Sequence, residues 1–283
     1  MGVFVPRKKA FWQRKPSSGQ EVDWANPLAF GLVVYAPLEL SSGSEVRNLA
    51  GDQGGGIDQD IDITPEGFIY AGGTAGNDVA YATATPPADS DSYTIIVRAR
   101  TTYIPTGGDY PSLVSTRNAG NNRFNLNLDG EESDSTKATF IAQNSIGGVI
   151  KAKLPKPPVN EFVTYGIAYD DLGSRKIRLQ MSSESSVAVS GALTGTLEPY
   201  NNEGIYLGNR RAGGREWSGG ISDFYFFNEA KSDEEVRSLI DAPYQLLKPR
   251  RSYWHMPSGV TPPQTFKPAW AMASRRSGLI GAR

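Results

Sequence analysis

Three aspartates, Asp58, Asp60 and Asp62, occupy alternate positions shortly after a run of three glycines. On a strand, this spacing would place all three carboxylates on one face. A retaining glycosidase needs two carboxyl groups about 5–5.5 Å apart, but a glycine-rich aspartate run is typical of a loop, so we expect no catalysis here. Two alternatives stay open: a calcium-binding loop, since clustered carboxylates suit a hard cation, and a solvated acidic loop.

Other catalytic and metal-binding chemistry lacks the necessary residue types. His255 is the single histidine, and the chain contains no cysteine. A serine–histidine–aspartate triad built on a core histidine is therefore not expected, and a site with several histidines or thiolates is excluded. Apart from the open calcium question, we predict no catalytic residue, no cofactor and no metal site.

A second candidate site lies on residues 123–130, where apolar and polar side chains alternate. On a strand, the polar set would share one face, and it consists of Asn125, Asn127 and Asp129. Such a face could line a concave, sugar-binding sheet on which Tyr103 or Tyr110 stacks against the sugar. The alternative is an ordinary exposed face of a half-solvated sheet.

The elements that would position these residues are short strands separated by turns. Apolar or alternating runs recur about every 10–15 residues, almost without helical periodicity, which predicts an all-β fold, an antiparallel β-sandwich of the jelly-roll type. The expected strands are 31–38, 66–71, 78–83, 92–100, 111–116, 123–130, 137–143, 161–171, 175–183, 204–209 and 216–228.

One short helix is predicted at residues 233–241. Ser232 and Glu235 form a capping box ahead of an apolar stripe, acidic residues occupy the first turn, and Pro243 ends the helix. We expect this helix to pack at an edge of the sandwich.

Charge is distributed unevenly along the chain. Residues 1–20 carry five basic and no acidic residues, and residues 243–283 carry seven basic and no acidic residues. The segment between them holds 17 basic residues against 30 acidic residues, a net charge of −13. Basic tails indicate an acidic partner, for which nucleic acid, an anionic lipid surface and an acidic protein, including a neighbouring copy, are alternatives. Nucleic-acid binding is the weaker prediction, and no apolar run is long enough for a membrane span.

Both tails combine cations with proline and tryptophan, which favours extended arms that insert aromatic rings into a partner. We therefore divide the chain into an N-terminal arm (1–27), a jelly-roll sandwich (28–242) and a C-terminal arm (243–283). The candidate docking residues are Trp12, Arg14, Lys15, Lys248, Arg250, Arg251, Tyr253, Trp254, Trp270, Arg275 and Arg276. The alternative is that these tryptophans fold back onto their own sandwich.

The final strand and the helix carry a recognisable motif. Its residues are Trp217, Gly219, Ile221, Asp223, Phe224, Phe227, Asn228, Ala230, Ser232, Glu234, Glu235, Val236 and Leu239. With the strands before it, this motif resembles the laminin-G-like or concanavalin A-like jelly-roll family over roughly residues 30–241. The resemblance implies a jelly roll and, by analogy, carbohydrate binding.

The flanks resemble a narrower group. The segments 22–38 and 244–254 are similar to those of tailed-bacteriophage structural proteins that carry this jelly roll. That resemblance implies a non-enzymatic virion protein, a capsid decoration, fibre or tail-associated subunit. Its partners would be capsid, portal or tail subunits, and a homo-oligomer is expected. The alternative function is a receptor-recognition module that binds host surface glycans.

Overall fold

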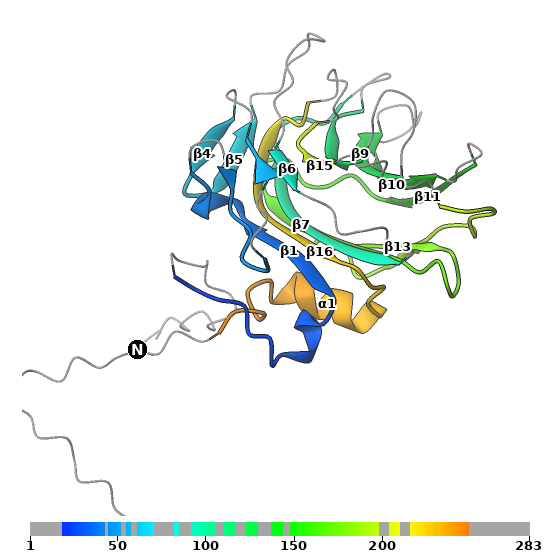
Figure 1. Ribbon diagram of the computed structural model, residues 1–283. Coiled ribbons are helices and arrows are strands. Elements are labelled where there is room, and N and C mark those ends of the chain that lie inside the picture. The colour runs from blue at the N-terminus through cyan, green and yellow to red at the C-terminus, as the bar shows by residue number, and fades with distance from the viewer. Residues whose placement is uncertain are drawn as a thin grey trace, which may run out of the picture. The chain divides into compact units, whose positions relative to one another are not determined.

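The computed structural model is an antiparallel β-sandwich with one α-helix (Figure 1). It describes residues 19–42, 45–51, 55–57, 61–70, 82–84, 92–105, 110–116, 123–129, 137–143, 148–197, 204–209 and 216–248. The predicted fold class, an all-β sandwich with a single short helix, is confirmed for these residues.

The first sheet has eight strands in the order β14-β13-β12-β7-β16-β5-β4, with β1 pairing alongside β16. Its strands are β1 (Leu32–Pro37), β4 (Asp62–Thr64), β5 (Gly67–Tyr70), β7 (Tyr93–Thr101), β12 (Phe162–Tyr169), β13 (Ile177–Met181), β14 (Ala188–Val189) and β16 (Gly219–Phe227).

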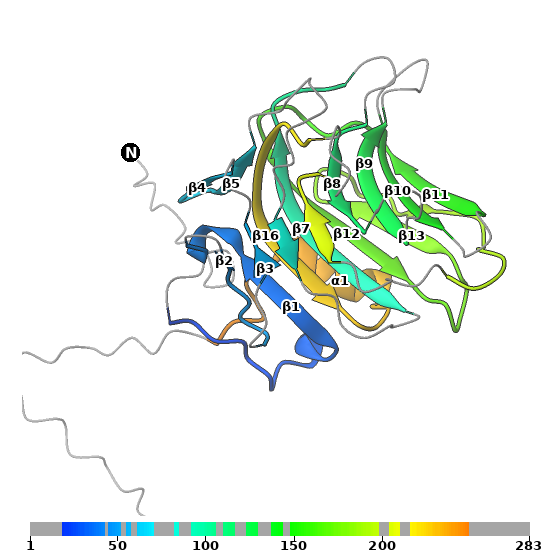
Figure 2. The same ribbon diagram turned by 45° about the horizontal axis from the view of Figure 1, so that its top comes forward.

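The second sheet has six strands in the order β11-β10-β9-β8-β15-β6 (Figure 2). Its strands are β6 (Ala82–Ala84), β8 (Ser112–Ser115), β9 (Phe124–Asp129), β10 (Lys137–Gln143), β11 (Val149–Leu154) and β15 (Ile205–Leu207). A small pair, β2 (Glu45–Val46) with β3 (Gly55–Gly56), and two single-turn 3-10 helices, η2 (Pro27–Ala29) and η3 (Leu38–Leu40), complete the described elements.

Aromatic rings from both sheets fill the space between them. The Tyr93 ring on β7 lies 5.1 Å from the Phe124 ring on β9 and 6.2 Å from the Phe226 ring on β16, measured between ring centroids. Phe124 also stacks on Phe140 of β10 at 5.8 Å. These contacts join the sheets because the alternating apolar residues of each strand point to the same interior.

The strand β16 is buried along its whole length. It pairs with β7, β1 and β5. One of its faces meets the six-stranded sheet, and the other lies in a second apolar cluster that includes Tyr225 and Phe227. Burial on both faces favours apolar residues along a strand, which explains the last four residues of β16, Phe-Tyr-Phe-Phe.

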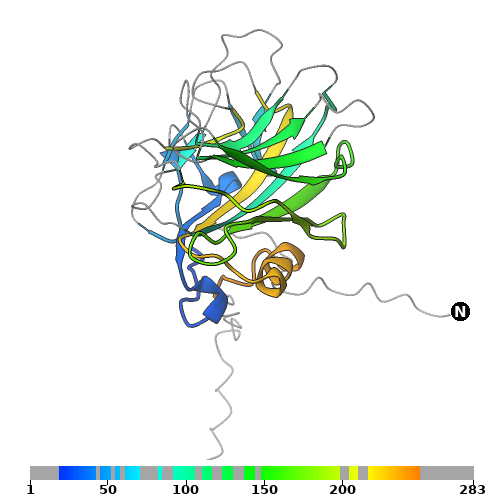
Figure 3. The ribbon, with the colours of Figure 1, turned by 90° about the vertical axis from the view of Figure 1, so that its right-hand side faces the viewer.

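The second cluster is closed by the helix α1 (Asp233–Asp241), whose bounds match the prediction. Both bonds of the capping box are present, from the Glu235 amide to Ser232 Oγ at 3.2 Å and from the Ser232 amide to Glu235 Oε2 at 2.8 Å. The predicted place at an edge is wrong, because α1 packs on the outer face of the eight-stranded sheet against β12, β13 and β7 (Figure 3). Gly166 on β12 permits this, since a Cβ there would lie 2.4 Å from Val236 Cγ1.

Segments near both ends of the described chain pair beside α1. Val22 and Leu247 form an antiparallel bridge, with the Asp23 amide donating to the Leu246 carbonyl at 2.7 Å. Val22, Leu246 and Leu247 are at most 2% exposed. The predicted domain boundaries of 28 and 242 are therefore too narrow, because apolar residues before 28 and after 242 complete the second cluster.

Gly219, the first residue of β16, provides a test of the close packing of β16 against β7. Its φ is +135°, and a Cβ would lie 2.0 Å from the Arg100 carbonyl oxygen of β7. We expect Gly219→Ala to lower the free energy of unfolding by about 2–4 kcal/mol, because both backbone strain and a backbone clash oppose the methyl group. Chemical denaturation measures the change. Gly191→Ala is the matched control, since a Cβ at Gly191 would meet no atom within 4 Å, and equal effects of the two substitutions would contradict the prediction.

Candidate functional site

The outer face of the six-stranded sheet carries the predicted polar residues of β9. Phe124, Leu126 and Leu128 point into the core, as the alternation predicts. Asn125, Asn127 and Asp129 point the other way, to a surface that we call the polar face. It consists of Ser112, Ser115, Asn125, Asn127, Asp129, Lys137, Thr139, Ile141, Gln143, Val149, Lys151, Lys153 and Tyr206, as the strand register places them.

Two rows of side chains cross the polar face at right angles to the strands. The Asn127 row runs from β8 to β11 and consists of Ser112, Asn127, Thr139 and Lys153. The Asn125 row runs from β15 to β11 and consists of Tyr206, Ser115, Asn125, Ile141 and Lys151. The Asn127 row begins at Ser112 and the Asn125 row begins at Tyr206. Each row ends at a lysine of β11.

Burial along the rows is graded. Asn125 and Asn127 are 2% exposed and Asp129 is 5% exposed, so the alternative of an ordinary exposed face at these residues is wrong, and the sugar-binding face stays a prediction. Exposure increases toward β11, the outermost strand of the sheet, where Lys151 and Lys153 are exposed. The accessible part of the polar face is therefore its β11 side.

Two buried polar atoms of the Asn127 row lack a hydrogen-bond partner. Ser112 Oγ donates to Asn125 Oδ1 at 2.6 Å. In contrast, Asn127 Oδ1 and Thr139 Oγ1 have no partner among the described residues. An unsatisfied buried polar atom costs about 1–3 kcal/mol, so two adjacent ones mark a place where a ligand hydroxyl or a water molecule would be stabilised.

The two tyrosines proposed for stacking lie in different places. Tyr110 lies two residues before β8 of the six-stranded sheet, and it is half-buried. Tyr103 follows β7 of the other sheet, where its carbonyl oxygen accepts a hydrogen bond from Thr101 Oγ1 at 2.6 Å. The register instead places Tyr206 of β15 on the polar face, opposite Ser115.

The predicted aspartate run falls mostly outside the described residues. Asp58 and Asp60 are not described, and Asp62 is the exposed first residue of β4. No group of three metal-ligating side chains occurs in the described part of the chain.

The polar face lies within the segment of the chain that a protein-family model matches. Residues 72–237 match the model described as the concanavalin A-like lectin/glucanases superfamily. The chain belongs to this superfamily. A comparison with curated proteins gives no match.

Solved structures share the fold of this concanavalin A-like domain at low sequence identity. The binding domain of botulinum neurotoxin DC in complex with SialylT has a TM-score of 0.56 and 10% identity, and the match covers 76% of this chain and 52% of that one. Trypanosoma rangeli sialidase in complex with sialic acid has a TM-score of 0.53 and 12% identity, covering 76% of this chain and 33% of the sialidase. The chain thus spans about a third of the sialidase and half of the neurotoxin domain, and the likeness is one of fold.

Of the predicted arm-docking residues, only Lys248 lies within the described part of the concanavalin A-like domain. Lys248 Nζ donates to Glu21 Oε2 at 2.8 Å, and its amide donates to the Glu21 carbonyl at 2.9 Å. The hydrogen bond and charge of Lys248 lower the pKa of Glu21 below its ordinary value. Lys248 therefore takes part in the pairing of the two terminal segments. The other ten docking residues, from Trp12 to Arg276, lie outside the described residues.

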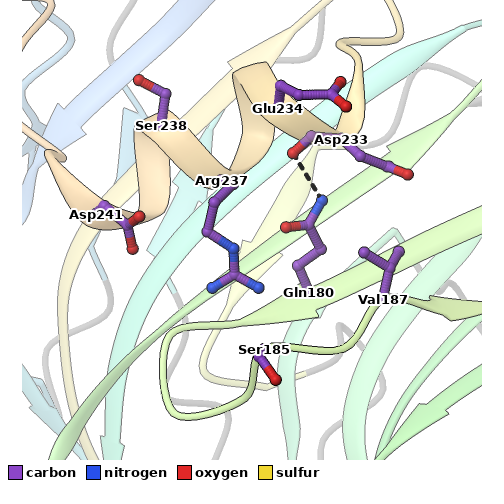
Figure 4. Close-up of a pocket in the computed structure, with 8 residues that line it drawn as sticks. All are labelled: Gln180, Ser185, Val187, Asp233, Glu234, Arg237, Ser238 and Asp241. Carbon is purple, nitrogen blue, oxygen red and sulfur yellow. Dashed lines mark hydrogen bonds between the residues drawn. The ribbon is translucent and has the colours of Figure 1, made fainter.

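A cavity of about 450 Å³ lies between α1 and the segment 180–187 (Figure 4). Its polar side chains mostly bond to the protein itself. Arg237 donates to the Glu184 carbonyl at 2.9 Å, and Gln180 Nε2 donates to the Asp233 carbonyl at 3.0 Å. These bonds attach α1 to β13 and to the turn that follows it. We therefore assign this cavity a structural role. None of the described helices is long and apolar enough to cross a membrane.

Sequence reasoning missed β11 and its two lysines. The signal was present in Val-Ile-Lys-Ala-Lys-Leu, where Ala152 and Leu154 alternate with Lys151 and Lys153. The alternation indicates a half-exposed strand, but no strand was predicted between 143 and 161.

The unpartnered Thr139 hydroxyl leads to a prediction on stability. We expect Thr139→Val to leave the free energy of unfolding unchanged or to raise it by about 1 kcal/mol, because the substitution removes a buried, unsatisfied hydroxyl. Thermal and denaturant unfolding measure the change.

Thr94→Val is the matched control. Thr94 is equally buried, but its hydroxyl donates to the Glu229 carbonyl and accepts from the Lys231 amide, both at 2.8 Å. This substitution should lower the free energy of unfolding by about 1–3 kcal/mol. A comparable loss in Thr139→Val would show that its hydroxyl has a partner.

Proposed function

We propose that the chain is a non-catalytic carbohydrate-binding protein and that the glycan binds on the polar face. The observation that carries the proposal is the pair of buried, unpartnered polar atoms, Asn127 Oδ1 and Thr139 Oγ1. Membership of the concanavalin A-like superfamily supports it. So do the complexes of the similar folds, with sialic acid in the sialidase and with SialylT in the neurotoxin domain.

The chemistry of the polar face suits sugar hydroxyl groups. Each hydroxyl donates one hydrogen bond and accepts others, so it matches an amide oxygen and a threonine hydroxyl at the same time. Ile141, the next residue after Thr139 on this face of β10, supplies apolar surface beside these atoms. A glycan would approach from β11, where the face becomes exposed.

The arrangement of carboxylates favours binding over hydrolysis. Within the described strands, Asp129 is the one carboxylate on the polar face, and Lys137 lies directly opposite it on β10. Hydrolysis of a glycosidic bond by the usual mechanism requires two carboxyl groups.

A glycan array probed with the full-length protein tests the proposal. We expect the wild type to bind a subset of glycans and Thr139→Val to bind them about 3- to 10-fold more weakly, as the loss of one hydrogen bond implies. Thr102→Val is the control, because this exposed hydroxyl lies just after β7 of the other sheet, where it shares a hydrogen bond with Ser218, and the variant should bind as the wild type does. A wild-type protein that binds no glycan would refute the proposal.

A second candidate function is virion assembly, in which capsid, portal or tail subunits bind the basic arms and the chain is located in the virion. The observation that favours it is the pairing of Val22 with Leu247, because both terminal segments leave the domain from adjacent positions. Residues 1–18 carry five basic residues and residues 249–283 carry six, with no acidic residue in either. Two basic segments joined at one place raise each other's effective concentration at an acidic partner.

Truncation tests this second function. Removing residues 249–283 should leave the unfolding temperature unchanged, because Tyr244, Leu246 and Leu247 of the second cluster remain, but the truncated chain should not be incorporated into particles. A full-length variant with the six basic residues of 249–283 replaced by glutamine separates charge from length. Normal incorporation of both variants would contradict the assembly role.

A further inference from the structure

The strand β11 presents two lysines at the accessible side of the polar face. Ala152 and Leu154 of this strand are 2% and 3% exposed and belong to the core, whereas Lys151 and Lys153 are exposed on the opposite face. Successive residues on one face of a strand lie about 6.6 Å apart. The two ammonium groups therefore start from neighbouring positions along the edge of the sheet.

Strand register connects these lysines to the unpartnered polar atoms. Lys153 lies directly opposite Thr139, which in turn lies opposite Asn127. Neighbouring strands are about 4.8 Å apart, so the Asn127 row passes from a cation to a hydroxyl and then to an amide within two strand spacings. Lys151 lies opposite Ile141 in the parallel row.

The register fixes the side chains beside these two lysines. Lys151 and Lys153 face Ile141 and Thr139, and their neighbour on the same face of β11 is Val149. The accessible end of the polar face thus carries cationic side chains, and the buried part of the Asn127 row is neutral and polar.

We infer that the glycan bound by the polar face is anionic, with its carboxylate or sulfate groups on Lys151 and Lys153 and its hydroxyl groups on Thr139 and Asn127. This inference rests on the proposed glycan binding and names the class of ligand. Exposed lysines contact an anion in a salt-sensitive way, whereas the buried hydrogen bonds are little affected by salt. Both an acidic sugar residue and a sulfated one satisfy this chemistry.

Paired probes that differ only in charge test the inference on the full-length protein. Sialyllactose is compared with lactose, oligogalacturonate with its methyl ester, and dextran sulfate with dextran. We expect at least one anionic member to bind about 10-fold more tightly than its neutral partner, with a preference that weakens as salt is added. The carboxylated and sulfated pairs show which acidic group is recognised.

Charge variants identify the residues responsible. Lys151→Gln with Lys153→Gln should remove most of the preference, lowering affinity for the anionic probe about 3- to 10-fold while affinity for the neutral partner changes little. The matched control is Arg47→Gln with Lys176→Gln, which removes two exposed cations outside the polar face and should keep the preference.

The outcomes separate this inference from the proposed function. Equal binding of anionic and neutral partners by the wild type would overturn the inference but leave glycan binding intact, as would loss of the preference in the Arg47 and Lys176 control. Equal binding of polyglutamate, which contains no sugar, would show a general polyanion site and would also overturn it. Failure of every glycan to bind would refute both.

Discussion

The structure depends on the burial of β16 on both of its faces. This strand pairs with β7, β1 and β5, so it joins the two halves of the eight-stranded sheet. One face requires the six-stranded sheet as a cover, and the other requires α1 together with the segments around Val22 and Leu247. Because an antiparallel sheet with two apolar faces cannot remain open to water, the strand forces the chain into three layers.

This constraint also positions the polar face and the two terminal segments. The six-stranded sheet uses its inner face to cover β16, which leaves its outer face for the polar rows of β8 to β11. The terminal segments are held together because both contribute apolar residues to the cluster on the opposite side.

The polar face combines stability with a local cost. Ser112 donates a hydrogen bond to Asn125, whereas Asn127 and Thr139 keep unsatisfied atoms. Two such atoms are expensive relative to the marginal stability of a folded domain. Their position beside two exposed lysines, rather than at random in the sheet, is the reason to regard them as parts of a binding site.

The sequence by itself determined the fold class, the alternation of β9 and the bounds of α1, because these depend on periodicity and on a capping box that act within a few residues. It also determined the charge of the arms. Tertiary structure alone decided that α1 covers a face of the sheet rather than an edge. It also decided that Tyr244, Leu246 and Leu247 belong to the core and that Asn127 is buried. Pairing register decided that Lys153 and Thr139 stand side by side. These features depend on contacts between distant segments, which no local pattern in the chain specifies.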